Sequence, residues 1–120
     1  MMENKEFGRQ LEKRTKDLAI NIIKLSIKLP LTAEAKVIKN QLTKSGTSIG
    51  AKYREANRSR SKADFKNKIK ICVSEASETG YWLEIISCFD RGYPEIVEQT
   101  TKESSEILAI LTSTEKKLNL

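Results

Sequence analysis

Apolar residues recur every three or four positions along almost the whole chain, and only two prolines, Pro30 and Pro94, interrupt them. This spacing keeps one side of a helix apolar, and no alternating pattern of useful length predicts a strand. Gly92 and the polar run 57–61 add further breaks, so the chain divides into four blocks of helix length. We therefore predict helices over about residues 4–29, 33–57, 62–91 and 94–118.

The ends of these blocks carry helix boundary signals. Thr32 is placed to cap the second block, and Ser61 with Asp64 fits a capping box for the third. Gly92 suits the left-handed position that often ends a helix. Four helices with short connections pack antiparallel, so the predicted fold is all-α: one domain over residues 1–120 that forms an up-down-up-down four-helix bundle.

The third block is apolar on two opposite sides. At about 100° per residue, the side expected to face the core holds Phe65, Ile69, Val73, Ala76, Gly80 and Leu83. The opposite side holds Ile71, Trp82, Ile85 and Phe89. An exposed stripe with such aromatic residues is typical of an interface, so we expect an oligomer contact there. The alternative is that the other helices of the chain wrap around this stripe and cover it.

The charge of the chain, +6 overall, is unevenly distributed. Residues 36–70 hold 11 basic and 2 acidic side chains, whereas residues 71–120 hold 4 and 9. The turn between the second and third blocks gathers a basic corner, which we define as Arg54, Arg58, Arg60, Lys62, Lys66 and Lys70. Lysine and arginine beside the free amides of a helix start suit phosphate oxygens, so we predict that the basic corner binds RNA or another nucleic acid without base specificity. The alternatives are a solvated surface and a surface neutralised by the acidic fourth block of a neighbouring subunit.

Catalytic and metal-binding patterns are missing from the sequence. It has no histidine and no Cys-x-x-Cys pair, so a zinc site would need two distant thiols and carboxylates. Glu75 and Glu78 share a helix face, but such a pair without further catalytic groups is more often a salt bridge or a solvated pair. Gly46 and Gly50 fit close helix contact rather than a phosphate loop. We expect no enzyme activity, no catalytic residue, no metal, no cofactor and no small-molecule substrate.

Cys72 and Cys88 lie in one predicted helix at a separation of about 24 Å, too far for a disulfide within one chain. We expect both thiols to be buried and reduced. The apolar runs are far shorter than the roughly 20 residues that span a bilayer, and none follows the charged start of the chain. We therefore expect a cytoplasmic protein with no membrane contact.

Three segments of the sequence resemble a known family. They are residues 45–56 (SGTSIGAKYREA), 61–65 (SKADF) and 74–83 (SEASETGYWL). In these segments, and from about residue 11 to 83, the chain resembles the small proteins encoded by intervening sequences within bacterial large-subunit ribosomal RNA genes, the S23 family. The resemblance implies a four-helix bundle that assembles as a homopentameric ring, and it implies no established biochemical activity.

One position departs from the family pattern, which usually has asparagine where this chain has Lys52. A lysine beside an apolar stripe must reach a carboxylate or water. We expect it to lie in a polar seam with Ser48, Glu55, Glu75 and Glu78, and any of the three glutamates is a candidate partner. Overall, we predict a non-catalytic homo-oligomer that binds RNA. The alternative is a structural or protein-interaction module whose charge asymmetry serves self-assembly or a protein partner.

Overall fold

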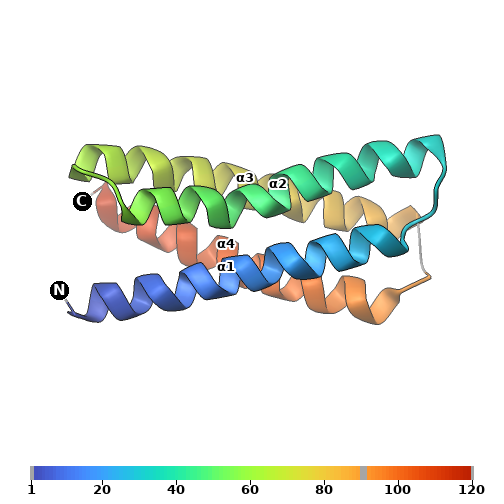
Figure 1. Cartoon of the computed structure of the whole chain (residues 1–120), viewed down its shortest axis with the longest axis horizontal. Helices are drawn as coiled ribbons and strands as arrows, with labels where there is room; N and C mark the ends of the chain where they lie inside the picture. Colours follow the sequence, from blue (N-terminus) through green and yellow to red (C-terminus); the bar gives the residue numbers. More distant parts are fainter. Residues whose placement is uncertain (1, 90–91, 120) are drawn as a thin grey trace.

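The computed structural model describes residues 2–89 and 92–119, and the side chains from residue 5 onward within them. It contains four helices, α1 (Met2–Lys28), α2 (Ala33–Asn57), α3 (Lys62–Phe89) and α4 (Pro94–Leu118). They run alternately up and down one long axis, and the molecule measures 46 × 22 × 21 Å (Figure 1). Each helix packs on the next in the chain, and α1 also packs on α4. The predicted all-α up-down four-helix bundle is confirmed.

The helix ends differ from the predicted ones at both ends of α1. α1 begins at Met2, earlier than expected, and stops at Lys28, before Leu29 and Pro30. The expected end of the third helix at residue 91 lies outside the described residues, and α3 is helical up to Phe89. The left-handed conformation predicted for Gly92 stays a prediction, because the φ angle of this residue depends on the position of residue 91, which lies outside the described residues. The chain enters α4 through Tyr93 as N-cap, at φ −137° and ψ 58°.

Side-chain caps form at the starts of α2 and α3. The Thr32 hydroxyl accepts a hydrogen bond from the amide of Ala35 at 3.1 Å, as predicted. The Ser61 hydroxyl accepts one from the Asp64 amide at 3.0 Å, which is one half of the predicted capping box. The second half does not match the prediction, because the Asp64 carboxylate accepts a bond from Lys68 Nζ at 2.9 Å.

The Asp64 carboxylate also ties down the turn between α2 and α3. The hydrogen bond from Lys68 is the main cause that lowers the pKa of Asp64, and the Ser59 hydroxyl and the Arg60 backbone amide contribute to the same effect. All of these groups stabilise the ionised carboxylate. The turn that carries the basic corner is therefore ordered by a local network centred on Asp64.

The core runs the length of the bundle. Its largest fully buried apolar side chains are Leu18, Ile22, Leu25, Leu42, Ile49, Ile69, Leu83, Ile86, Ile107 and Leu111. The buried face of α3 includes Cys72 and Thr79, whereas we predicted Val73 and Gly80. Thr79 can be buried because its hydroxyl lies 3.0 Å from the Ser45 hydroxyl and 2.8 Å from a backbone carbonyl of its own helix. The core face of α3 thus keeps Ile69, Ala76 and Leu83 but is rotated slightly toward Cys72 and Thr79.

Gly46 and Gly50 allow α1 and α2 to approach closely. A Cβ atom at Gly46 would overlap Ile22 Cδ1 and lie 3.1 Å from Ile22 Cγ2. A Cβ atom at Gly50 would lie 3.1 Å from Thr15 Oγ1 and 3.3 Å from the Thr15 backbone. Their predicted role in close helix contact is confirmed.

The two cysteines differ in their surroundings. Cys72 is buried, and its thiol lies 3.8 Å from the carbonyl oxygen of Ile49. Burial raises the pKa of Cys72 to about 12. Cys88 is exposed, so the expectation that both thiols are buried is wrong for it, because it lies near the end of α3 on the side away from the core.

No helix in the described ranges is long and apolar enough to cross a membrane. This agrees with the short apolar runs in the sequence.

The glycine contacts predict opposite effects for two identical substitutions. Gly46→Ala would force a methyl group against Ile22 in a packed core, so we expect a loss of about 1–2 kcal/mol in the free energy of unfolding. Gly80→Ala meets nothing within 4 Å, so we expect a gain of about 0.5–1 kcal/mol from helix propensity. Urea unfolding at one fixed protein concentration measures both. Equal effects would show that the close contact of α1 with α2 does not limit side-chain size.

The cysteine environments predict one fast and one slow thiol. At pH 8 the folded protein should react with a thiol reagent at Cys88, whereas Cys72 should react only after denaturation, because its thiolate is both inaccessible and disfavoured. Cys88→Ser should abolish the fast reaction, and Cys72→Ala should leave it unchanged. A rapid reaction of two thiols per chain in the folded wild-type protein would contradict the burial of Cys72.

Candidate nucleic-acid interface and oligomer surfaces

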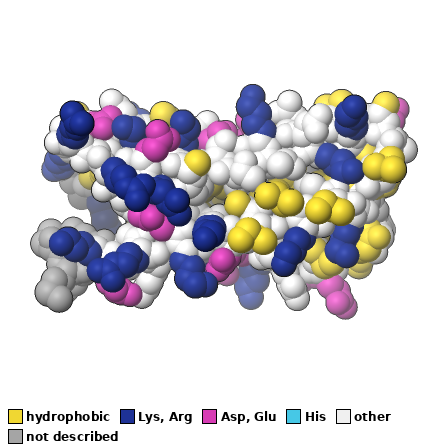
Figure 2. Space-filling view, viewed as in Figure 1, with side chains coloured by type: hydrophobic (Ala, Val, Ile, Leu, Met, Phe, Trp, Pro, Cys, Tyr) yellow, Lys and Arg dark blue, Asp and Glu magenta, His cyan; other side chains and the backbone are white. Residues whose placement is uncertain are grey.

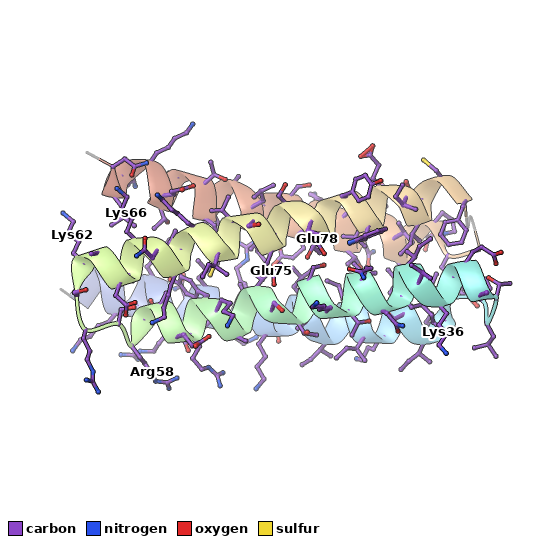
Figure 3. The ribbon with its side chains drawn as sticks, turned by 90° about the horizontal axis from the view of Figure 1, so that it is seen from above. Lys36, Arg58, Lys62, Lys66, Glu75 and Glu78 are labelled. Atoms are coloured by element: carbon purple, nitrogen blue, oxygen red, sulfur yellow. The ribbon has the colours of Figure 1, made fainter. Side chains whose placement is uncertain are left out.

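The basic corner lies at one end of the bundle, where α2 ends and α3 begins. Figure 3 shows Arg58, Lys62 and Lys66 at this end of the molecule. Lys66 is half-buried, whereas Arg58, Arg60, Lys62 and Lys70 are exposed. Among the side chains that the structure describes, none of these five cations forms an ion pair. Their charges are therefore available to a ligand.

Arg54, the sixth member of the basic corner, differs from the other five. Its Nε atom lies 3.5 Å from a carboxylate oxygen of Glu12 on α1. The other oxygen of Glu12 accepts a hydrogen bond from the Asn57 side-chain amide at 2.8 Å. Arg54 therefore holds α2 to α1, and its charge is matched within the chain.

The start of α3 contributes less positive potential than we expected. The Ser61 hydroxyl already accepts the bond from the Asp64 amide, and the Asp64 carboxylate lies in the first turn. A negative side chain at this place offsets the positive end of the helix dipole. The potential of the basic corner therefore comes from its side chains rather than from free backbone amides.

The fold adds three cations that the sequence analysis missed. Lys5 and Arg9 of α1 and Lys117 of α4 line an open groove that also includes Lys62. The up-down topology brings the start of α1, the end of α4 and the α2–α3 turn to the same end (Figure 1). The predicted topology could have revealed this set, but charge counted over contiguous segments does not join residues from opposite ends of the chain.

The second apolar stripe of α3 is only partly open. Ile71 and Phe89 are 44% and 45% exposed, whereas Trp82 and Ile85 are half-buried. Trp82 packs against the core cluster, and its indole N–H donates to a carboxylate oxygen of Glu78 at 3.3 Å. The four residues predicted as one oligomer contact are therefore divided, because the bundle itself covers part of the stripe.

A more exposed apolar surface lies on α1 and α2. We call it the α1–α2 patch, and it consists of Ile20, Ile23, Ile27, Leu31 and Val37. Ile27 and Leu31 are 75% and 93% exposed. Figure 2 shows hydrophobic side chains gathered on the half of this face away from the basic end. The sequence carried a signal for it, since residues 20, 23, 27 and 31 form a second stripe at helical spacing.

The predicted polar seam is a surface feature. Lys52 Nζ lies 3.3 Å from a carboxylate oxygen of Glu55, and both side chains are about half exposed. The Ser48 hydroxyl donates to a carbonyl of its own helix at 2.6 Å. Glu75 and Glu78 lie midway along α3, and Glu78 accepts the bond from Trp82 (Figure 3). An exposed pair such as Lys52 with Glu55 contributes little to stability.

Among the side chains described, no group of three or more cysteine, aspartate or glutamate residues is placed to hold a metal ion.

The comparisons with known proteins agree with this architecture. The family model of the 23S rRNA-intervening sequence protein matches residues 9–113. A protein of unknown function from the S23 ribosomal protein family of Bacteroides thetaiotaomicron VPI-5482 has a similar crystal structure, with a TM-score of 0.80 and 37% sequence identity. The match covers 88% of this chain and 98% of that one. No curated protein is significantly similar to the chain. With a family model matching most of its length and a solved member matching its fold, the chain belongs to the 23S rRNA-intervening sequence protein family.

Proposed function

We propose that this protein is a non-catalytic, self-assembling protein that binds RNA through the basic corner. The observation that carries the proposal is the set of five cations, Arg58, Arg60, Lys62, Lys66 and Lys70, that have no carboxylate partner within the described side chains. By contrast, Arg14 in the middle of α1 pairs with both Glu103 and Glu106.

Unpaired cations at one end of a small bundle repel one another, which opposes folding. A polyphosphate removes this repulsion and releases its own counterions, which drives association. Contacts of this kind are made to the backbone of the nucleic acid, so they provide affinity rather than sequence recognition. The proposed ligand is therefore RNA recognised first through its phosphates.

Removal of two arginines should weaken this binding in a way that salt reveals. We expect Arg58→Ala/Arg60→Ala to lower the affinity for a labelled ribosomal RNA fragment in a fluorescence-anisotropy titration. The slope of log K against log salt concentration should become shallower by about 0.7 per lost contact on single strands and about 0.9 on duplex DNA. Both side chains are exposed, so the fold should be unaffected.

A matched control removes the same charge elsewhere. Lys16→Ala/Lys102→Ala changes two exposed lysines on α1 and α4 that lie away from the turn. If this control and the arginine variant lose equal affinity, the basic corner is not the binding site. If the wild-type protein does not bind even at low salt, the proposal of RNA binding is wrong.

The exposed α1–α2 patch favours a second role, self-assembly. Burial of its five apolar side chains against another copy would remove them from water, and surfaces of this kind usually mark interfaces. The positive side chains of Lys36 and Lys39 lie beside it in a shallow groove with Ile23 and Leu31. The half-open stripe of α3 carries acidic neighbours, Glu78 and Glu84, so it is a complementary surface for the next subunit.

Contact between two different surfaces closes into a ring when the rotation permits it. We propose a homopentameric ring, a stoichiometry that rests on the family resemblance. The alternative function is that assembly, or docking of a protein partner, is the whole purpose of the charge asymmetry.

Charged residues in the α1–α2 patch should dissociate the assembly. We expect Ile27→Glu/Leu31→Glu to sediment as a monomer at micromolar concentration, because both side chains are exposed in the single chain but would be buried in the ring. Ser105→Glu/Ala109→Glu places the same charges, four residues apart, on the exposed face of α4 and should leave the assembly intact. A wild-type protein that is itself monomeric would overturn the ring.

A further inference from the structure

The groove beside the basic corner combines aromatic and cationic side chains. It lies at the end of the bundle, has a volume of about 970 Å³, and receives residues from all four helices. Its aromatic residues are Phe7, Tyr53 and Phe65, and its cations are Lys5, Arg9, Lys62 and Lys117. Binding sites for small organic groups typically enclose about 300–1,000 Å³ and join apolar walls to a few polar groups.

Phe7 is the accessible aromatic ring of this groove. It is 46% exposed, although its position in the helical stripe predicts a core residue. It escapes the core because it lies in the first turns of α1, past Leu11, the last fully buried residue of the α1 stripe at this end. Tyr53 is almost completely buried below the groove, and Phe65 packs partly against the core. Of the three rings that line the groove, Phe7 is therefore the one most accessible to a ligand.

The electrostatics of the groove favour an anion. None of its four cations forms an ion pair with a described side chain. Among the described lining residues, Glu12 is the one carboxylate, and it is already matched by Arg54 and by the Asn57 amide. Burial raises the pKa of Tyr53, so its phenol adds no negative charge near neutral pH. A ligand that joins a flat ring to a phosphate group would match both the accessible aromatic ring and the positive charge of the groove.

We propose that this groove is a nucleotide subsite of the RNA-binding surface, in which Phe7 stacks on an unpaired base while Lys5, Arg9, Lys62 and Lys117 contact the flanking phosphates. The inference rests on the proposed function, and Lys62 connects the two because it belongs to both the basic corner and the groove. A duplex keeps its bases stacked inside, so only an unpaired nucleotide can enter. The groove therefore selects single-stranded RNA or an unpaired end, a preference that phosphate contacts alone do not provide.

The test compares the affinities of a single strand and a duplex for proteins with and without the Phe7 ring. A labelled single-stranded RNA and a blunt duplex of the same length are titrated against wild type and Phe7→Ala. Stacking on one aromatic side chain changes affinity by about 5- to 150-fold per base. We expect Phe7→Ala to weaken single-strand binding at least about fivefold while duplex binding changes less than about twofold. Phe7→Trp, which keeps a stacking surface, should restore single-strand binding.

A matched control and a direct readout complete the experiment. Tyr93→Ala removes an aromatic side chain of similar exposure, 39%, at the start of α4, away from the groove and from the proposed contact surfaces, and should leave the single-strand preference intact. Sedimentation of each variant confirms that the assembly is unchanged before affinities are compared. A 2-aminopurine in the single strand should lose fluorescence on binding to wild type and less on binding to Phe7→Ala.

The outcomes separate the two proposals. If wild type binds neither ligand at low salt, the proposed function fails and the subsite fails with it. If both ligands bind with steep salt dependence and Phe7→Ala weakens both or neither, RNA binding stands and the nucleotide subsite is wrong. If Phe7→Ala weakens only single-strand binding, and Phe7→Trp restores that binding, the result supports the groove as the nucleotide subsite.

Discussion

The close approach of α1 to α2 is the contact on which the rest of the molecule depends. Gly46 and Gly50 present no side chain to α1, so Ile22 and Thr15 pack directly against the α2 backbone. This contact keeps α1 close beside the antiparallel α2 along the bundle. At the basic end Glu12 meets Arg54 and Asn57, and Phe7 lies over the groove. A wider spacing would separate the groove's α1 wall from its α2 and α3 walls, so core packing determines the shape of the candidate site.

The fold concentrates positive charge and compensates only part of it. An up-down bundle places the start of α1 and the end of α4 beside the α2–α3 turn, and basic residues from three segments meet there (Figure 1). Glu12 neutralises Arg54, and Asp64 pairs with Lys68, so the charges of Arg54 and Lys68 are compensated within the chain. The outer cations are left unpaired among the described residues. A chain selected for stability alone would reduce this repulsion, and its retention is the physical argument for an anionic ligand.

The fold could be predicted from the sequence because helical periodicity and breakers are local signals. The buried face of α3 could not be predicted in full, because the burial of Thr79 depends on the Ser45 hydroxyl of another helix. The basic corner was found because its members are close in sequence, whereas Lys5, Arg9 and Lys117 join it only through topology. The α1–α2 patch also has a local signal, the apolar stripe at residues 20, 23, 27 and 31, but its exposure depends on which face of α1 the other helices cover.

The two candidate surfaces occupy opposite ends of the bundle. Ile27 and Leu31 lie at the α1–α2 connection, whereas the groove lies beside the α2–α3 turn, and the long axis of the molecule is 46 Å (Figure 1). A contact confined to the α1–α2 patch would therefore leave the groove of that subunit open. In a closed cyclic assembly every subunit presents this groove in an equivalent position. If the proposed subsites exist, several of them on one particle would act together on one RNA, and the effective concentration of the second site would raise the overall affinity without any new contact. The residues proposed for assembly and those proposed for RNA binding are thus different, and in a ring the two activities would reinforce each other.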